Sequence, residues 1–278
     1  MTILLRSVEL KSELPASRAY PFSLPVVRHL GTLTFSAPVT LFVGENGSGK
    51  STILEAIAAA AGSITVGAES VGAESVGVDP DLQPARRLAG AMRLIWSKRT
   101  RRGFFLRAED FLGYVRRMQS LRRDLAQDAA EMERRYAGRG LAVSLGKMPM
   151  EGSLAAMREK YGEGLDTRSH GESFLDLFHA RLQPGGLYLL DEPETPLSPL
   201  KQLSLLRMFH DAVTSGAQFI IATHSPILMA YPGACILNFD TVPPSPAAYD
   251  DLEHVRILRD FLNHRDAFLK PLFDPQAP

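Results

Sequence analysis

The sequence contains one cysteine among 278 residues, Cys235, and it has no long apolar run. A single cysteine can form neither an intramolecular disulfide nor a multi-cysteine metal site, so we expect a reducing, cytoplasmic location. Apolar stretches such as 56–61 and 219–222 are far shorter than the roughly 20 residues that span a bilayer. The N-terminus meets a charge at Arg6, too early for the apolar core of a signal peptide. We therefore expect no secretion signal and no membrane insertion.

An excess of charge is also absent, because 31 Lys and Arg residues balance 31 Asp and Glu residues. The charges are unevenly distributed, however, since residues 86–139 hold 15 basic and 6 acidic side chains. Part of this basic region, 108–136, carries apolar residues at helical spacing and three arginine pairs: Arg116–Arg117, Arg122–Arg123 and Arg134–Arg135. A solvated helix face and a nucleic-acid contact both explain such pairs.

Short apolar runs alternate with helix-forming stretches over much of the chain. The pattern predicts strands at 39–43, 187–190, 218–223 and 234–239, and helices at 51–61, 173–182, 199–213 and 250–262. Such alternation is typical of an α/β fold with a largely parallel sheet and helices on both faces. Strands are also predicted at 3–10 and 30–35, where we expect them to pair beside the 39–43 strand, and at 88–96 and 103–106. Residues 86–165 are predicted to form a basic, mainly helical subdomain inserted in a single domain spanning 1–278.

A glycine-rich turn joins the predicted strand at 39–43 to the helix that follows. Its sequence fits the phosphate-binding pattern G-x-x-x-x-G-K-[ST], followed by Thr52, with the residues Gly44, Glu45, Asn46, Gly47, Ser48, Gly49, Lys50 and Ser51. Glycines let several backbone N–H groups point at one phosphate, and the helix start adds its positive end. The pattern therefore predicts that Lys50 reaches the terminal phosphates of a nucleotide and that Ser51 binds Mg²⁺.

Two carboxylates follow the buried strand predicted at 187–190. Asp191 and Glu192 would lie at the carboxyl end of that strand, where open α/β sheets hold their ligands. We expect Asp191 to hold Mg²⁺, mainly through water, and Glu192 to act as the general base that activates a water molecule.

These motifs resemble those of the ATP-binding-cassette ATPases. Leu190-Asp191-Glu192-Pro193 is similar to the Walker B motif with its catalytic glutamate, and Thr223-His224-Ser225 resembles the segment with the switch histidine. Residues 168–173, Arg-Ser-His-Gly-Glu-Ser, stand where that family has its signature L-S-G-G-Q, and only Ser169 and Gly171 match it. Residues 104–109, Phe-Phe-Leu-Arg-Ala-Glu, and the form of the signature look most like those of small stand-alone bacterial ATPases related to the recombination and chromosome-maintenance branch.

The resemblance implies a P-loop NTPase fold of cassette type, with an antiparallel N-terminal β portion and an inserted helical subdomain. It also implies ATP and Mg²⁺ as cofactors, with Lys50, Glu192 and His224 as catalytic residues. Two chains would form an ATP-dependent homodimer, in which Ser169 and Gly171 of one subunit contact the γ-phosphate bound by the other.

Other family positions match less closely. The aspartate of the D-loop is missing from 195–199, which leaves Ser198 as the candidate, and Glu109 stands in place of the Q-loop glutamine. Tyr20 or Phe22 could stack on adenine, but an aromatic between prolines is more often explained by simple packing, so neither is counted among the binding residues.

The process driven by ATP hydrolysis stays open at this point. A membrane-transporter subunit, a nucleotide-controlled DNA or RNA clamp using the basic region, and a sensor that activates an effector are the alternatives. The unusual signature and the basic region favour a stand-alone protein over a transporter subunit. A small-molecule kinase is disfavoured, because Glu192 and His224 are arranged for attack by water.

Overall fold

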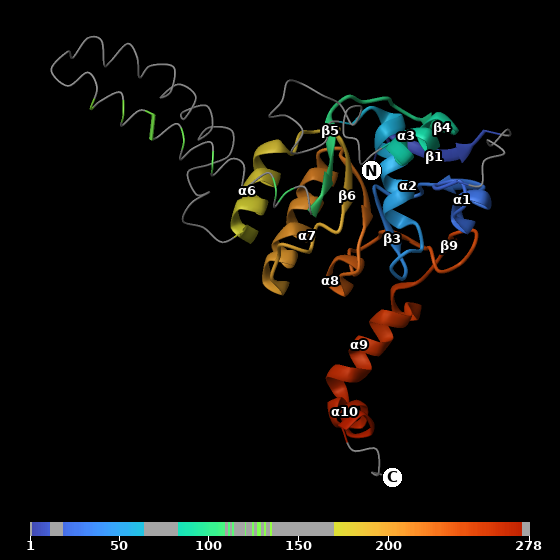
Figure 1. Cartoon of the computed structure of the whole chain (residues 1–278), viewed down its shortest axis with the longest axis vertical. Coiled ribbons are helices and arrows are strands. Elements are labelled where there is room, and N and C mark those ends of the chain that lie inside the picture. Colours follow the sequence, from blue (N-terminus) through green and yellow to red (C-terminus); the bar gives the residue numbers. More distant parts are fainter. Residues whose placement is uncertain are drawn as a thin grey trace.

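The computed structural model of the chain describes residues 2–11, 19–63, 83–108 and 170–273, together with scattered positions between 111 and 134. These residues form two β-sheets with helices packed between and outside them (Figure 1). Most of the predicted inserted subdomain, 86–165, lies outside the described residues. The described positions between 111 and 134 are helical, and the subdomain as a whole stays a prediction.

The larger sheet has six strands in the order β5-β6-β7-β3-β8-β9. Its strands are β3 (Val39–Val43), β5 (Gly103–Arg107), β6 (Leu187–Asp191), β7 (Gln218–Ala222), β8 (Cys235–Asn238) and β9 (Ser245–Pro246). The first five strands in this order run parallel, and β9 pairs antiparallel at the edge. The predicted parallel α/β sheet is therefore confirmed.

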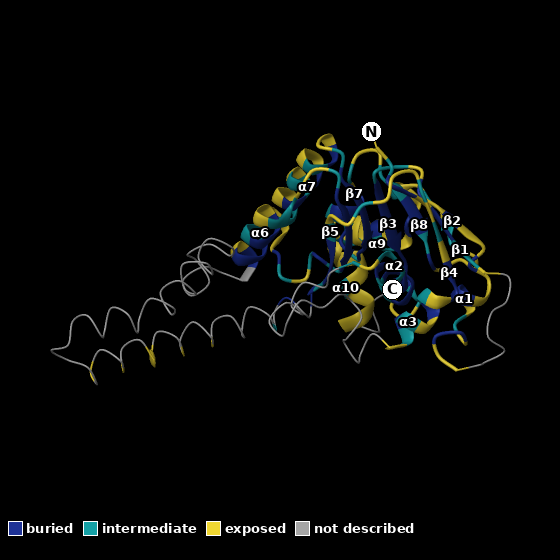
Figure 2. Ribbon diagram, turned by 90° about the horizontal axis from the view of Figure 1, so that it is seen from above, coloured by how far each residue is buried: buried dark blue, intermediate teal, exposed yellow. Residues whose placement is uncertain are grey.

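Helices cover both faces of this sheet, because alternate strand residues point to opposite sides. On one face, α6 (His170–Arg181), α7 (Pro199–Thr214) and α8 (Pro226–Met229) pack on an apolar cluster that includes Tyr188, Leu190, Phe219 and Ile221. On the other face, α2 (Lys50–Ala61) contributes to a second cluster that contains Leu189 and Ile220. Figure 2 shows the buried strands between these layers.

The smaller sheet is antiparallel, with strand order β2-β1-β4. It consists of β1 (Leu5–Leu10), β2 (Thr32–Thr34) and β4 (Met92–Trp96), and it shares the α2 core with the short helix α1 (Pro25–Arg28). The antiparallel N-terminal portion is thus confirmed, but its expected pairing beside β3 is wrong. Parallel neighbours, β7 and β8, occupy both edges of β3, so β1 and β2 pair in a separate sheet.

One buried side chain joins the two sheets. The Gln218 side chain is fully buried at the start of β7. Its Oε1 accepts hydrogen bonds from the N–H groups of Leu4 at 2.9 Å and Leu5 at 2.8 Å, and its Nε2 donates to the Leu5 carbonyl at 3.0 Å. Because unpaired buried polar groups are costly, these bonds fix β1 against the start of the parallel sheet.

The strand predicted at 88–96 is only partly correct. Its first residues end helix α3 (Gln83–Gly90), and β4 begins at Met92. Ala85 and Leu88, three residues apart, are buried in the α2 core. This i, i+3 spacing puts them on one helix face and explains why the segment is helical.

The C-terminal segment leaves the sheet and extends away from it (Figure 1). A 3₁₀ turn, Tyr249–Asp251, precedes α9 (Glu253–Asn263) and α10 (Arg265–Phe273). Leu252 and Val255 anchor the start of this segment in the core, whereas most of the following residues are exposed. Among the residues that the structure describes, no helix combines the length and the apolar character needed to cross a membrane.

Candidate active site

The glycine-rich turn connects the carboxyl end of β3 to the start of α2. Gly49 caps α2 in a left-handed conformation, with φ of 96°. A Cβ atom at this position would lie 2.5 Å from Val26 Cγ1, so both the backbone angle and the close packing require glycine. The turn therefore brings the backbone and Lys50 to the same edge of the sheet.

Lys50 is buried at the first position of α2. Its Nζ donates hydrogen bonds to the carbonyls of Gly44 at 2.7 Å and Glu45 at 2.8 Å. Burial lowers the pKa of Lys50, while the carboxylates of Asp240 and Asp191 raise it. The ammonium group thus sits inside the curl of the loop, where a phosphate group would meet both its charge and the loop N–H groups.

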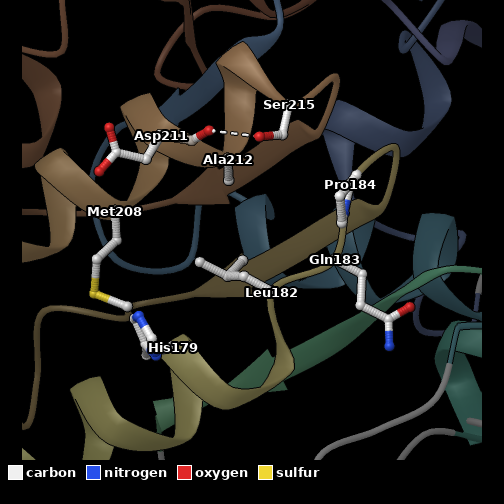
Figure 3. A pocket seen from close by; sticks show the side chains of 8 residues that line it. All are labelled: His179, Leu182, Gln183, Pro184, Met208, Asp211, Ala212 and Ser215. Carbon is white, nitrogen blue, oxygen red and sulfur yellow. Dashed lines mark hydrogen bonds between the residues drawn. The ribbon is translucent and has the colours of Figure 1, made fainter.

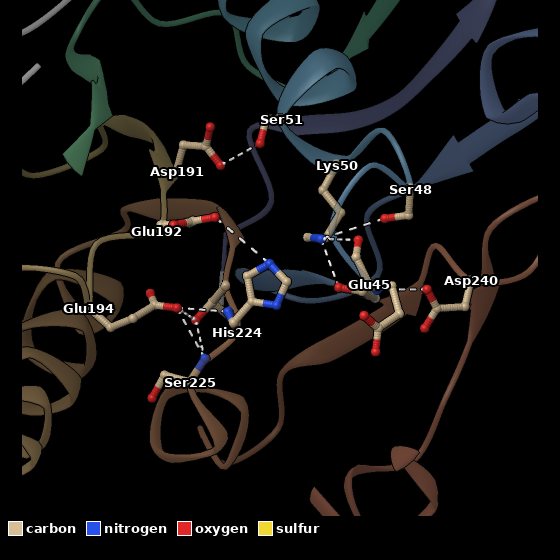
Figure 4. Close-up of polar contacts among 12 residues, drawn as sticks. Glu45, Ser48, Lys50, Ser51, Asp191, Glu192, Glu194, His224, Ser225 and Asp240 are labelled. Atoms are coloured by element: carbon tan, nitrogen blue, oxygen red, sulfur yellow. Dashed lines mark hydrogen bonds and ion pairs between the residues drawn. The ribbon is translucent and has the colours of Figure 1, made fainter. Parts of the chain in front are cut away.

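Ser51 and Asp191, 140 positions apart in sequence, meet directly (Figure 4). The Ser51 hydroxyl donates to Asp191 Oδ1 at 3.0 Å. Asp191 is 8% exposed, and burial raises the pKa of its carboxyl from the usual 3.8 to about 7, with the Ser51 hydrogen bond acting in the opposite direction. The structure therefore brings these two residues together at one edge of the sheet, and their binding of Mg²⁺ stays a prediction.

These two oxygens fit a magnesium ion. Mg²⁺ binds through one or two protein oxygens, completing its octahedron with water and substrate phosphates. Within the described residues there is no cluster of three or more His, Cys, Asp or Glu side chains, and Mg²⁺ held in this way needs none. A cation beside Asp191 would also offset the cost of burying its carboxylate.

Glu192 is the only residue other than glycine with a positive φ, 49°, in the described part of the chain. Its N–H donates to the Ala222 carbonyl at 2.9 Å, and its carbonyl accepts from the Thr195 N–H at 3.1 Å. A non-glycine residue in this conformation is uncommon and costs on the order of 1–3 kcal/mol. The turn directs a half-exposed carboxylate into the space above Lys50 rather than continuing the strand.

His224 reaches the same space from the end of β7. Its Nε2 lies 3.7 Å from Glu192 Oε1, and both side chains are partly exposed. Burial lowers the pKa of His224, and the positive charge of Lys50 lowers it further. This lowered pKa favours the neutral imidazole, which can donate one ring N–H to an acceptor.

A cavity of about 260 Å³ lies where these elements meet. It is lined by Tyr20, Leu24, Asn46, Gly47, Gly49, Lys50, Ser51, Thr52, Glu192 and His224. Of the two upstream aromatics, Tyr20 lines this cavity and its hydroxyl is 3.0 Å from Thr52 Oγ1, whereas Phe22 is buried in the core. Of these two aromatics, Tyr20 is therefore the one placed to contact a nucleobase in this cavity.

The signature-like segment is only partly described. Ser169 and Glu109 lie outside the described residues, as does the side chain of His170. Gly171, in the first turn of α6, is buried, and a Cβ atom there would lie 2.9 Å from the Pro196 carbonyl and 2.9 Å from Lys201 Cδ. Gly171 thus packs on the segment before α7 and does not line the cavity beside Lys50.

Two acidic residues at this edge were missed by the sequence reasoning. Asp240 follows β8, and its Oδ1 accepts a hydrogen bond from the Glu45 N–H at 2.7 Å. Glu194 lies two residues beyond Glu192 and binds the turn that carries His224. Asp240 directly follows the strand predicted at 234–239, and this position was the available signal, whereas Glu194 lies three residues beyond the end of β6 and had no comparable signal.

A second pocket, of about 380 Å³, lies at the opposite edge of the sheet (Figure 3). Its lining comes from the end of α6, the end of α7 and the loop before β6, and includes His179, Leu182, Gln183, Met208 and Asp211. None of the predicted site residues that the structure describes lines this pocket.

The fold and this edge define a P-loop nucleoside-triphosphate-binding protein. Two family models match the sequence. Residues 22–132 match a family described as an AAA domain, and residues 173–230 match one described as an AAA domain, putative AbiEii toxin, Type IV TA system. Both matches are to AAA domains, and they are consistent with the resemblance of the motifs to those of P-loop ATPases. No curated protein matches the chain.

Several solved structures are similar at low sequence identity. The ATP-binding subunit of an ABC transporter is 19% identical, with 92% of this chain and 95% of that chain covered and a TM-score of 0.42. The SMC head domain from Thermotoga maritima is 16% identical, with 85% and 94% covered and a TM-score of 0.40. The Smc head domain from Pyrococcus furiosus, bound to the C-terminal domain of ScpA, is 14% identical, with 93% and 99% covered and a TM-score of 0.43. At these TM-scores the likenesses support no conclusion about function.

The buried Asp191 carboxylate gives a test based on stability. Because its folded-state pKa of about 7 is above the usual 3.8, ionisation costs stability as the pH rises between these values. Asp191→Asn removes this cost while keeping an oxygen that can accept from Ser51. Without Mg²⁺ and nucleotide, we expect the variant to be more stable than the natural protein by about 2–4 kcal/mol at pH 8, and by less at pH 5.

Urea unfolding at the two pH values measures this difference. Asp211→Asn is the matched control, because Asp211 is exposed on α7 and its replacement should leave the pH dependence unchanged. An Asp191→Asn protein that is no more stable than the natural protein at pH 8 would show that ionisation of this buried carboxyl does not destabilise the fold.

Proposed function

We propose that this protein hydrolyses ATP to ADP and phosphate with Mg²⁺, and that it does so as a homodimer enclosing two nucleotides. The observation that carries the proposal is the meeting of Ser51 with Asp191 at the P-loop, beside a cavity lined by Lys50, Glu192 and His224. A binding loop, a metal-binding pair and a candidate base share one edge of the sheet. Triphosphate binding alone does not require a carboxylate held in the conformation of Glu192.

In the proposed complex, the backbone N–H groups of residues 44–49 and the positive end of α2 bind the phosphates. Lys50 contacts the terminal phosphates, and Ser51 and Asp191 hold the metal ion, with Asp191 acting mainly through water. A bound Mg²⁺ neutralises charge on the phosphate oxygens. Thr52 follows the loop in α2, and its hydroxyl lies 3.0 Å from the hydroxyl of Tyr20, the aromatic proposed to contact the adenine ring.

Glu192 is proposed to act as the general base. Its carboxylate takes a proton from a water molecule while the water oxygen attacks the γ-phosphorus, and the bond to the ADP oxygen breaks. The neutral His224 ring donates a hydrogen bond to the γ-phosphate, where negative charge is spread over the equatorial oxygens. Both side chains already face the cavity, so the expected catalytic set Lys50, Glu192 and His224 is consistent with its geometry.

The position of the start of α6 supports the proposed dimer. A helix start is an anion-binding feature, yet Gly171 packs against Pro196 and lies outside the lining of its own chain's cavity. If the resemblance to the cassette signature holds, a second chain must bring Ser169 and Gly171 to the γ-phosphate. A two-fold arrangement then completes two sites with the same contacts.

Glu192→Gln tests the base and the dimer together. The amide keeps the size of the side chain but cannot take a proton, so we expect hydrolysis to slow by about 10²–10⁴-fold while ATP stays bound. The variant should then accumulate as a dimer with ATP and Mg²⁺ and stay monomeric with ADP, which has no γ-phosphate. Size exclusion with light scattering measures the mass in each nucleotide.

A second substitution separates nucleotide binding from dimerisation. Ser169→Arg adds bulk at the proposed contact, so combining it with Glu192→Gln should return the protein to monomer without loss of ATP from the P-loop. A Glu192→Gln protein that is equally monomeric in ATP and ADP, with nucleotide shown to be bound, contradicts the proposed dimer.

Nucleic-acid binding is a second candidate function, and a loop in the described part of the basic region favours it. Residues 98–102, Lys-Arg-Thr-Arg-Arg, join β4 to β5 at the sheet edge opposite the P-loop, and all four basic side chains are exposed. Within the described residues none of the four forms an ion pair. Three of them line a hollow of about 460 Å³ with Gly185 and Gly216. Exposed guanidinium groups can donate paired hydrogen bonds to phosphate oxygens.

The loop should make DNA or RNA binding depend on salt. We expect charge reversal at Lys98, Arg99 and Arg101 to reduce affinity and to flatten the log–log salt dependence by about 2–3 units, at 0.7–0.9 per phosphate contact. Fluorescence anisotropy with duplex and single strands, at several salt concentrations, measures the slope.

The matched control reverses three exposed charges elsewhere, at Arg207, Arg256 and Lys270, which gives the same net charge. Its salt dependence should follow that of the natural protein. Absence of binding at low salt, or equal losses in both triple variants, contradicts a contact at this loop. The arginine pairs at 116–117 and 122–123 lie outside the described residues, so their contact stays a prediction.

A further inference from the structure

Glu194 connects the ends of two neighbouring strands at the active-site edge. It lies in the segment between β6 and α7, and its Oε1 accepts three hydrogen bonds from consecutive residues after β7. The donors are the Thr223 hydroxyl at 2.7 Å, the His224 N–H at 2.7 Å and the Ser225 N–H at 3.0 Å. Figure 4 shows this carboxylate to the left of the His224 ring, with dashed lines to the turn that carries the ring.

The contact is buried, which makes it costly to lose. Thr223 is fully buried, Ser225 is 6% exposed, and the second oxygen of Glu194 is buried without a hydrogen-bond partner among the described residues. Buried N–H groups deprived of an acceptor carry a desolvation penalty. The turn therefore keeps its shape as long as the Glu194 carboxylate is in place.

The same turn determines where the His224 ring lies. His224 follows the last residue of the β7 ladder by two positions, so strand pairing alone does not hold its N–H. Its ring Nε2 is 3.7 Å from Glu192 Oε1 and lines the cavity beside Lys50. Glu194 itself is not among the residues that line this cavity. Any influence of Glu194 on a bound nucleotide is therefore indirect, and His224, whose N–H it accepts, is a lining residue that it contacts directly.

Glu194 also belongs to the segment that contacts the start of α6. The Leu197 N–H donates to the Glu194 carbonyl at 2.8 Å, and the Pro196 carbonyl packs against Gly171. The Gln202 side chain also joins this segment to the turn that carries His224. It donates to the Leu197 carbonyl at 3.2 Å and accepts from the Ser225 hydroxyl. Segment 194–197 is thus bonded on one side to the His224 turn and packed on the other against Gly171.

We propose that Glu194 is a positioning residue that holds segment 194–197 and the His224 turn as one unit, so that contacts at the start of α6 set the position of the imidazole. The proposal rests on the proposed function, in which the start of α6 meets the γ-phosphate of the partner subunit's nucleotide. Under this proposal, binding of a second chain at the start of α6 changes the position of the His224 ring through segment 194–197. The sequence motif Asp-Glu-Pro-Glu, 191–194, then combines a metal ligand, a base and a residue that aligns the histidine.

A double-mutant cycle of Glu194→Ala and His224→Ala tests this coupling. Loss of the carboxylate frees the turn, and misplacement of a catalytic group by about 1 Å can lower rates by about 10²-fold. We expect Glu194→Ala to lower kcat by about 10–100-fold while the Kd for ATP changes less than about threefold. The double variant should be no slower than the slower single variant, because both changes remove the same contact.

Two further variants control for loss of folding. Glu194→Gln keeps an accepting oxygen at the position of Oε1 and should recover most of the kcat lost by the alanine variant. Glu253→Ala, an exposed glutamate at the start of α9, should behave as the natural protein. If Glu194→Ala fails to fold, Thr223→Val removes one of the three hydrogen bonds and should lower kcat without weakening ATP binding. Independent effects that multiply in the double variant, or a matching loss of ATP affinity, contradict a positioning role.

A readout that does not need hydrolysis separates this proposal from the proposed function. NMR of ¹³C-labelled histidine, with the resonance assigned by its loss in His224→Ala, reports the environment of the ring directly. We expect Glu194→Ala, but not Glu253→Ala, to shift this resonance. A shifted resonance in a protein with no ATPase activity overturns the proposed function and keeps the positioning role, whereas an unmoved resonance overturns the positioning role.

Discussion

Parallel pairing of β6, β7 and β3 is the constraint on which the active-site edge depends. Asp191 pairs with Ala222, and Ala222 pairs on its other side with Phe42, so only one strand separates the Asp191 carboxylate from the strand that leads into the P-loop. The carboxyl ends of parallel strands meet at one edge, and α2 starts there. Residues far apart in sequence, such as Ser51 and Asp191, consequently reach hydrogen-bond distance.

This edge contains several features that oppose stability. Asp191 and Glu194 are carboxylates whose pKa values are raised by burial, Lys50 is a buried ammonium, and Glu192 has an unfavourable backbone conformation. Such features cluster at functional sites, where the rest of the structure must hold them in place. Here the two apolar clusters on either side of the sheet, and the Gln218 bonds between the sheets, provide that support.

The sequence was most informative where one short segment decides the outcome. The P-loop turn and the buried strands before Asp191 and His224 follow from glycine spacing and apolar runs, and the structure confirms these elements. It was least informative about pairing between distant segments. The position of β1 and β2 in a separate sheet depends on the parallel neighbours of β3 and on Gln218, and neither leaves a local pattern. Glu194 was missed for the same reason, because its three partners lie about 30 positions further along the chain.

The central claim, that the carboxyl edge of this sheet binds and hydrolyses ATP, is tested most directly by nucleotide binding and turnover in the natural protein and in Lys50→Ala. The lysine contact with phosphate is a charge-assisted hydrogen bond worth roughly 1.5–3 kcal/mol, which corresponds to about 10–150-fold in affinity. The account predicts Mg²⁺-dependent ATP hydrolysis by the natural protein, and a Lys50→Ala protein that folds normally but loses ATP affinity by this factor together with its turnover. Equal ATP affinity and equal turnover in the two proteins would contradict it.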